Sequence, residues 1–219
     1  MNEKMIICFD LDNTLIQAKT IHNKAFSKAF EKNNLKLSNI KKLEAEYGKP
    51  GKEVIKSLFP QLNKKEIKKV IDDHAFYVKK YVKKHVKKIP YAKNTLKKIK
   101  KMDVKMCITS NSRHASIEAI LKGANIDMKM FDLIIGGDEI KNPKPAPDQL
   151  LKVKNKLKIK KAFMIGDTTY DAIAAQKANF KSIIITKYST QNLKTIKKTK
   201  PDYIVKEIKD IIKIITKNQ

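Results

Sequence analysis

Two aspartates stand one residue apart near the start of the chain, directly after a run of apolar residues. The run is MIICF (residues 5–9), and Asp10 and Asp12 follow it, with Thr14 two positions further on. Carboxylates are rarely buried without a partner, because removing a charge from water is unfavourable. Two of them at the end of a buried strand therefore predict a reactive site, where a carboxylate can act as a nucleophile or carry a proton.

Polar side chains also follow three later apolar runs. The second run ends in Thr109, Ser110 and Asn111, the third leads through GGDEI to Lys144 in NPKPAPD, and the fourth ends in GDTTYD, which contains Asp167 and Asp171. In an open parallel sheet, ligands bind beyond the carboxyl ends of the strands. We therefore expect four carboxylates, one lysine and a hydroxyl to meet at one edge of a sheet.

The elements that must position these residues alternate along the chain. Short β-branched runs, typical of strands buried on both faces, are separated by lysine-rich segments with apolar residues at helical spacing. This alternation predicts an α/β fold with a Rossmann-like parallel sheet covered by helices on both faces. The expected strands are 5–9, 104–109, 132–137, 162–167, 181–186 and 202–205.

One segment interrupts the alternation. Residues 17–85 contain no convincing strand, and an apolar stripe from Ile67 to Ile89 predicts one long helix with a lysine-rich outer face. We therefore expect an all-helical cap domain at 17–85, inserted into a core domain made of 1–16 and 86–219. In the cap, the loop EYGKPGKEV is punctuated by glycine and proline and is a candidate for contacting substrate.

The composition is strongly basic, with 49 Lys and Arg against 22 Asp and Glu and a net charge of +27. The lysines are spread along the whole chain and aromatic residues are scarce, so the sequence disfavours nucleic acid as a partner and favours small anions such as phosphate esters. No apolar run reaches the ~18 residues that a membrane span needs. We expect a cytoplasmic protein without membrane contact, either a monomer or a homodimer.

Taken in order, these motifs resemble the haloacid dehalogenase superfamily. They are D-x-D-x-T after the first strand, a hydroxyl residue after the second, Lys in K-P-x-P, and G-D-x-x-x-D after the fourth. The resemblance covers the whole chain, including the helical insertion after the first motif. Within the superfamily, the chain is most similar to the group of phosphoglycolate phosphatase-like and β-phosphoglucomutase-like proteins. Asn13 departs from the glycine often found at its position, but asparagine tolerates left-handed backbone angles.

This resemblance implies an enzyme, a phosphoric monoester hydrolase that acts through an aspartyl-phosphate. Asp10 matches the family's nucleophile, Asp12 its general acid and base, and Lys144 the cation that neutralises both nucleophile and phosphoryl group. Ser110 is preferred over Thr109 as the hydroxyl that binds phosphate. The residues expected to contact substrate are Thr14, which also orders the turn after the strand, Asn111, and Lys49 or Lys52 of the cap loop.

The resemblance also implies Mg²⁺ as cofactor, because a carboxylate that attacks a phosphate dianion needs a cation to offset the repulsion. The matching ligands are Asp10, the backbone carbonyl of Asp12, and Asp167, with Asp171 nearby or acting through water. The expected partner is a small phosphorylated metabolite, phosphoglycolate-like.

Several alternatives stay open on sequence alone. A phosphomutase of the β-phosphoglucomutase type would use the same nucleophile, and the +27 charge leaves a nucleic-acid-binding or non-enzymatic role open. A dehalogenase is disfavoured because that branch lacks the second aspartate. Single residues also have ordinary structural roles: Lys144 as a surface lysine, Asp171 as a first-turn acid, and Ser110 as a helix cap. The four histidines show no metal-ligand spacing and are interpreted as surface or cap-packing residues.

Overall fold

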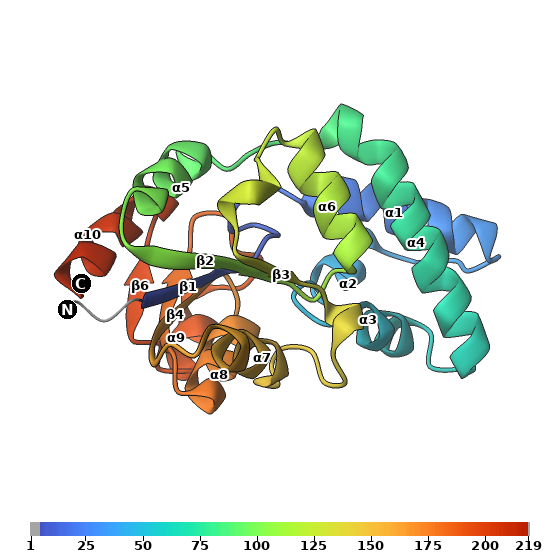
Figure 1. Ribbon diagram of the computed structural model, residues 1–219. Helices are drawn as coiled ribbons and strands as arrows, with labels where there is room; N and C mark the ends of the chain where they lie inside the picture. The colour runs from blue at the N-terminus through green and yellow to red at the C-terminus, as the bar shows by residue number, and fades with distance from the viewer. Residues whose placement is uncertain (1–4, 219) are drawn as a thin grey trace.

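The structure is a computed structural model that describes residues 5–218, so residues 1–4 of the predicted core and residue 219 lie outside the described residues. Its centre is a parallel sheet with strand order β3-β2-β1-β4-β5-β6 (Figure 1). The strands are β1 (Met5–Phe9), β2 (Val104–Thr109), β3 (Leu133–Ile135), β4 (Lys161–Gly166), β5 (Lys181–Ile185) and β6 (Tyr203–Val205). The predicted α/β class is confirmed, and each predicted strand lies within two residues of its expected bounds.

Helices cover both faces of the sheet, as Figure 1 shows for α5, α6 and α10 on one side and α7, α8 and α9 on the other. The central strand explains why both layers form, because its alternate side chains point to opposite faces. Ile7 and Phe9 pack in one apolar cluster, and Ile6 and Cys8 in the other. The helices are α5 (Ala92–Lys100), α6 (His114–Gly123), α7 (Asp148–Leu157), α8 (Thr169–Ala178), α9 (Leu193–Lys198) and α10 (Ile211–Lys217). Within residues 5–218, the core also contains three short 3₁₀ turns, Met128–Met130, Gly137–Glu139 and Ile208–Asp210.

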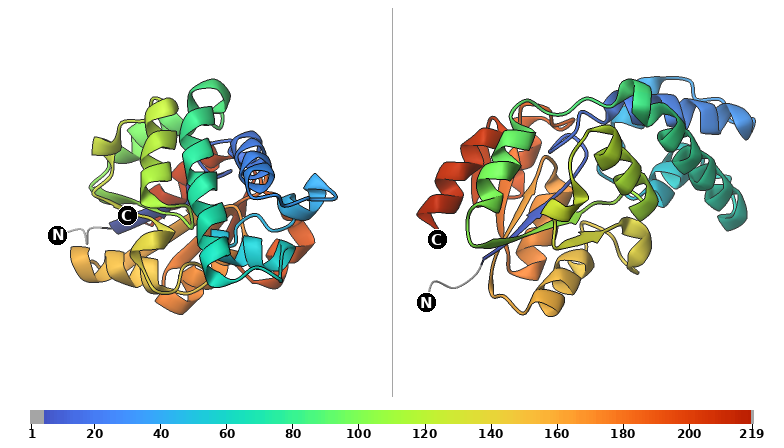
Figure 2. Two further views of the ribbon diagram at one scale, coloured as in Figure 1. Left: turned by 90° about the vertical axis from the view of Figure 1, so that its right-hand side faces the viewer. Right: turned by 45° about the horizontal axis from the view of Figure 1, so that its top comes forward.

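Four helices lie between β1 and α5, and we call them the cap. They are α1 (Lys19–Lys32), α2 (Ile40–Glu44), α3 (Gly51–Leu58) and α4 (Lys64–His85). They have an apolar cluster of their own, in which Phe26 and Phe30 of α1 meet Val54 of α3 and Val70 of α4. The cap lies beyond the carboxyl ends of the central strands and extends away from the sheet (Figures 1 and 2).

Helix α4 begins where the sequence indicates, but it ends earlier than predicted. Asn63 and Glu66 form a capping box at its start. The helix ends at His85, and Val86 has extended backbone, so the prediction of a helix as far as Ile89 is wrong. The reason is that the two segments joining cap and core pair with each other: the Gln17 amide donates to the Lys87 carbonyl at 2.8 Å, and the Ile89 amide to Leu15 at 3.0 Å.

The C-terminal half of α4 also packs directly on the core. Val78 and Val82 belong to the apolar cluster of the sheet, and a Cβ atom on Gly123 of α6 would lie only 3.1 Å from Val82. A side chain at this position would push Val82 aside by a few tenths of an ångström, so glycine favours the close approach of α4 and α6. The cap thus contacts the core through a packed helix pair as well as through its connecting segments.

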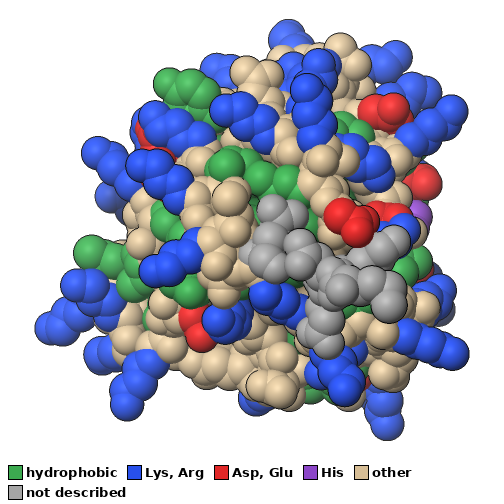
Figure 3. Space-filling view, turned by 60° about the vertical axis from the view of Figure 1, so that its left-hand side comes forward, with side chains coloured by type: hydrophobic (Ala, Val, Ile, Leu, Met, Phe, Trp, Pro, Cys, Tyr) green, Lys and Arg blue, Asp and Glu red, His purple; other side chains and the backbone are tan. Residues whose placement is uncertain are grey.

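The surface carries lysine on many sides. Figure 3 shows lysine and arginine side chains scattered over the visible face, interrupted by apolar and acidic side chains. Among the described residues, no helix combines the length and apolarity that crossing a membrane would require.

Candidate active site

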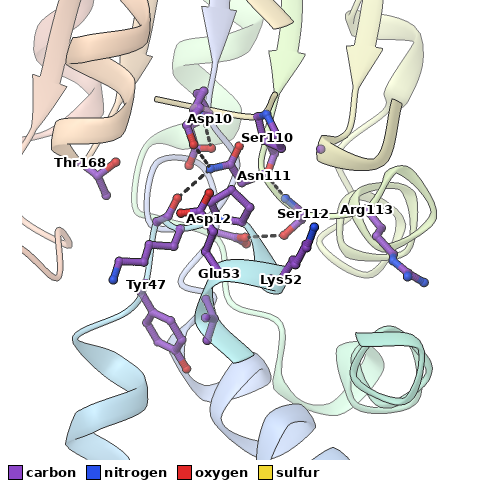
Figure 4. Close-up of a pocket in the computed structure, with 18 of the residues that line it drawn as sticks. Asp10, Asp12, Tyr47, Lys52, Glu53, Ser110, Asn111, Ser112, Arg113 and Thr168 are labelled. Carbon is purple, nitrogen blue, oxygen red and sulfur yellow. Dashed lines mark hydrogen bonds and ion pairs between the residues drawn. The ribbon is translucent and has the colours of Figure 1, made fainter. Parts of the chain in front are cut away.

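A pocket of about 770 Å³ opens between the carboxyl ends of the strands and the cap. The polar residues that the sequence assigns to separate strand ends converge on it, as expected for a parallel sheet. Its core side includes Asp10, Asp12, Ser110, Asn111, Lys144, Asp167 and Asp171, and its cap side includes Lys49 and Lys52. Figure 4 labels Asp10, Asp12, Ser110 and Asn111 of the core side and Lys52 of the cap side.

Lys144 lies at the centre of the core side and is 2% exposed. Its Nζ donates to Oδ1 of Asp10 at 2.8 Å, to Oδ1 of Asp171 at 2.6 Å and to the carbonyl of Thr109 at 2.8 Å. All three ammonium hydrogens therefore have partners. Burial by itself lowers the pKa of Lys144, but the two carboxylates outweigh it and raise the pKa above its usual value. The surface-lysine reading of Lys144 is excluded by this burial.

Asp10 directly follows β1, and its buried side chain contacts Lys144. Burial is the main cause that raises its pKa, to about 7, with Asp171 and Asp12 adding to the effect and Lys144 opposing it. The backbone amide of Asp10 donates to the Ile165 carbonyl at 2.8 Å, which ties the end of β1 to β4. Asp10 is thus a buried carboxylate with a fixed cation beside it, which is how a nucleophile can be held next to an anionic substrate.

Asp171 has both carboxylate oxygens occupied by protein donors. Oδ1 accepts from Lys144, and Oδ2 accepts from the backbone amide and hydroxyl of Thr168 and from the amide of Asp167. Asp171 therefore lies in the first turn of α8 and forms a capping box with Thr168. The same carboxylate that caps the helix also contacts Lys144, so the helix-capping role and a position in the site occur together.

Three carboxylates could hold a metal ion. One oxygen each from Asp10, Asp167 and Asp171 lies within 4.8 Å of the others, and all three residues are buried. Oδ2 of Asp167 is buried without a hydrogen-bond partner. Burial, followed by the charge of Asp10, raises the pKa of Asp167 well above its usual value. Buried oxygens in this arrangement suit a hard divalent cation, so the residues fit the predicted Mg²⁺. The side chain of Asp12 is not part of this group.

Asp12 is held by one of its two oxygens only. Oδ2 lies 3.1 Å from Nε2 of His22 and accepts from Oγ of Ser112 at 3.0 Å, whereas Oδ1 is buried without a partner. Burial acts to raise the pKa of Asp12, but the charge of His22 and these hydrogen bonds outweigh it and lower the pKa. Oδ1 is therefore the oxygen of Asp12 that makes no hydrogen bond to the described residues.

Two histidines of the cap, which the sequence indicates only as surface or cap-packing residues, complete this arrangement. His22 of α1 contacts Asp12, and its Nδ1 lies 3.1 Å from Nε2 of His74 on α4. Burial would lower the pKa of His22, but Asp12 raises it. Nothing in the spacing of these histidines predicts the contact. Ser112, also missed, is the third residue after β2.

Thr109, Ser110 and Asn111, at the end of β2 and just after it, make different contacts. The Thr109 hydroxyl donates to Sδ of Met164 at 3.4 Å, so it points away from the pocket, while Ser110 lines it. This position supports the preference for Ser110. The side-chain amide of Asn111 donates to the carbonyls of Gly48 and Lys144, both at 2.8 Å. Asn111 therefore joins cap and core, and only its Oδ1 is left to meet a substrate.

The other predicted substrate contacts are less direct. Thr14 is fully buried and is not among the described residues that line the pocket. Lys49 lines the pocket, but its Nζ pairs with Glu46 at 2.5 Å. Lys52 lines the cap side, where Figure 4 places it near Glu53 and Ser112. Asn13 has φ of 58°, the left-handed conformation that its side chain tolerates.

Comparisons with known proteins agree with this geometry. The family model described as haloacid dehalogenase-like hydrolase matches residues 7–185. A pyrophosphatase PpaX from Oceanobacillus iheyensis is 27% identical over 211 residues, which cover 95% of this chain and 95% of that protein. Another, from Halalkalibacterium halodurans, is 26% identical over 218 residues and 95% of each chain.

Solved structures share the fold at lower sequence identity. A protein from Haemophilus somnus, described as a predicted phosphoglycolate phosphatase, superposes with a TM-score of 0.85 at 24% identity and covers 98% of this chain and 99% of its own. CbbY from Rhodobacter sphaeroides, solved with phosphate, gives a TM-score of 0.81 at 17% identity over 94% and 95% of the two chains. The expected enzyme class is confirmed by the family match, and the chain belongs to the haloacid dehalogenase-like hydrolases.

Proposed function

We propose that the protein is a Mg²⁺-dependent phosphatase that hydrolyses a small phosphomonoester through a phosphorylated Asp10. The observation that carries this proposal is the contact of Asp10 with Lys144 at 2.8 Å, beside an Asp12 whose Oδ1 is free. A nucleophile, a fixed cation and a proton carrier thus line one pocket. These are the groups that phosphoryl transfer needs, because its catalysis depends chiefly on positioning and charge neutralisation.

In the first step, a carboxylate oxygen of Asp10 forms a bond to phosphorus and the bond to the leaving oxygen breaks. Oδ1 of Asp12 gives its proton to that leaving oxygen, so that an alcohol departs. Lys144 holds the carboxylate of Asp10 in place, and Ser110 lies where it can bind the transferred phosphoryl group. The products of this step are the free alcohol and an acyl phosphate on Asp10.

In the second step, Asp12 takes a proton from water as the water oxygen attacks phosphorus. The bond between phosphorus and the Asp10 oxygen breaks, and inorganic phosphate leaves with Asp10 and Asp12 restored. Bound Mg²⁺ would neutralise charge on the phosphoryl oxygens, and Asp10, Asp167 and the backbone carbonyl of Asp12 are the residues proposed to hold it, with Asp171 beside them. Asp171 keeps Lys144 oriented in both steps.

Pyrophosphate is a second candidate substrate. Two relatives that match almost the full chain are named pyrophosphatases. The cap side of the pocket also carries several cations, among them Lys49, Lys52 and Lys56, which suit an anionic leaving group. A phosphoglycolate-like monoester has an anionic leaving group as well, so both substrates match this surface.

The proposal is tested by measuring phosphate release from phosphoglycolate, several sugar phosphates and pyrophosphate with Mg²⁺, in the wild type and in Asp10→Asn. We expect turnover of at least one substrate and loss of about 10⁴-fold or more in the variant, because it lacks the nucleophile. Equal rates in the two proteins on every substrate would reject the phosphatase. Rapid acid quench should trap phosphate bound to wild-type protein, and not to Asp10→Asn.

A phosphomutase of the β-phosphoglucomutase type uses the same acyl phosphate, so it needs a separate test. A labelled sugar bisphosphate distinguishes the two reactions: a mutase returns the label to a sugar, whereas a phosphatase releases it as inorganic phosphate. A nucleic-acid-binding role predicts a salt-dependent shift with DNA or RNA that survives Asp10→Asn. The scattered lysines of Figure 3 give that role no localised surface on the visible face.

A further inference from the structure

The cap contributes a pair of histidines that touches the acid–base residue and that the chemistry above does not use. His22 of α1 is buried, and its two ring nitrogens have different partners: Nε2 lies 3.1 Å from Oδ2 of Asp12, and Nδ1 lies 3.1 Å from Nε2 of His74. The three side chains therefore form a chain of hydrogen bonds from α4 through α1 to the end of β1.

The hydrogen on Nε2 of His22 follows from this geometry. An ionised Asp12 only accepts hydrogen bonds, so Nε2 of His22 must carry the hydrogen. If His22 is neutral, its Nδ1 accepts from His74; if it is charged, its Nδ1 donates to His74. Contact with His74 is compatible with both states, and in both it stabilises the ring orientation that points Nε2–H at Asp12.

The surroundings of His74 hold its ring in place. The ring stacks on Phe26 with centroids 3.8 Å apart and on His22 with centroids 5.2 Å apart. Burial lowers the pKa of His74 well below its usual value, with the charges of His22 and Arg113 adding to the effect. A neutral imidazole can both donate and accept, so it serves either state of His22.

We propose that His74 is a positioning residue: it orients His22, which holds Oδ2 of Asp12 and leaves Oδ1 free for proton exchange with the leaving group and water. This inference rests on the proposed function, in which Asp12 is the acid and base. Because both histidines belong to the cap, the contact of His22 with Asp12 requires that α1 and α4 lie against the core, whereas the contact of Ser112 with Asp12 comes from the core itself. The cap would then act on the chemistry as well as on the choice of substrate.

The test separates hydrogen bonding by His74 from packing by its ring. His74→Phe keeps an aromatic ring on Phe26 but has no polar atom, whereas His74→Gln places an amide near the position of Nε2. We expect kcat to fall about tenfold in His74→Phe with KM changed less than twofold, and to recover most of its value in His74→Gln. His85→Phe is the matched control, because His85 lies on the same helix and contacts Tyr81 without touching His22.

Three kinetic results would each contradict a positioning role for His74, and they can be told apart. Unchanged kcat in His74→Phe overturns the proposal. Equal losses in the Phe and Gln variants overturn it as well, because the fit of the imidazole ring, and not its hydrogen bond to His22, would then account for the loss. A rise in KM with constant kcat shows that His74, which lines the pocket, contacts substrate instead. If His74→Phe does not fold, His74→Asn replaces it, because its shorter amide cannot reach His22.

Two further measurements complete the design. Nitrogen-15 NMR of the His22 ring should show hydrogen on Nε2 in all three proteins, with a weaker hydrogen bond from Nε2 to Asp12 in His74→Phe than in the wild type and His74→Gln. Asp12→Asn separates this inference from the proposed function. If Asp12→Asn hydrolyses substrate at the wild-type rate, the assigned acid–base role itself fails. If it is inactive while His74→Phe matches the wild type, only the role of His74 fails.

Discussion

The side-chain amide of Asn111, in the core, donates a hydrogen bond to the carbonyl oxygen of Gly48, in the cap, at 2.8 Å. The same nitrogen also donates to the carbonyl of Lys144 at 2.8 Å. One side chain thus joins the cap loop to the segment that carries the central cation. Closure of a cap over a reactive site excludes water and completes the set of reacting groups, and Asn111 is one of the contacts that maintains it.

Substitution of Gly48 should displace this cap loop. Its φ is +97°, and a Cβ atom would lie 3.0 Å from the ring of Tyr170 and 3.2 Å from the side chain of Thr168. Backbone strain of this kind amounts to about 1–3 kcal/mol. We expect Gly48→Ala to lower kcat/KM by about tenfold or more, measured on the substrate identified by the phosphate-release panel.

Gly51→Ala is the control for this prediction. Gly51 lies three residues further along, and its nearest contact would be Ile71 at 3.9 Å, so an added methyl group has room. We expect unchanged kcat/KM and the same or slightly higher thermal stability. If the two variants lose equal activity, the particular geometry of Gly48 is not responsible.

The only arginine of the sequence forms an ion pair between core and cap. Nη1 of Arg113 lies 2.6 Å from Oδ1 of Asp72 on α4, and Figure 4 shows the Arg113 side chain directed away from Asp10. Both side chains are partly exposed, so the pair contributes at most about 1 kcal/mol. We expect Arg113→Ala to lower kcat/KM by about two- to fivefold at low salt, with less effect at high salt.

Lys68→Ala provides the comparison, because Lys68 contacts Oδ2 of the same Asp72 within α4, at 2.8 Å. It removes a cation from Asp72 but breaks no contact between cap and core. A double-mutant cycle of Arg113→Ala and Asp72→Ala measures the coupling. Additive effects would argue against a cap–core role for this pair.

Removal of the Lys144 charge should destabilise the metal-free protein. Asp10 and Asp171 would then remain buried without a cation, and breaking a buried ion pair in this way costs about 3–5 kcal/mol. We expect Lys144→Met to lower the melting temperature by about 10 °C in EDTA, measured by calorimetry. Lys105→Met, which removes a half-exposed ion pair with Asp132, should shift it by no more than about 2 °C.

Mg²⁺ should stabilise the folded protein if the buried carboxylates bind it. A ligand present at 100 times its Kd adds about 2.7 kcal/mol to stability. We expect Mg²⁺ to raise the melting temperature of the wild type and EDTA to reverse this. Asp167→Asn should remove most of the shift, because Oδ2 of Asp167 is the free buried oxygen of the group. An undiminished shift in this variant would place the metal elsewhere.

The sequence alone was sufficient to predict the sheet and the residues at its edge. Short β-branched runs separated by helical patterns indicate parallel strands, and parallel strands place their carboxyl ends together. Asp10, Lys144 and Asp167 could therefore be assigned to one site although more than 130 positions separate Asp10 from Lys144. This prediction depends only on the local hydrophobic patterns of strands and helices and on the common edge formed by the carboxyl ends of parallel strands.

Only the tertiary structure decided how the cap meets this site. His22 and His74 are 52 positions apart, and Ser112 lies 100 positions from Asp12. Hydrophobic periodicity indicates which face of a helix is buried, but not the rotation and tilt with which two helices pack, and these angles determine which polar side chains touch. For the same reason, Asn111 was expected to bind substrate, whereas the fold uses its amide nitrogen to join the cap to the core.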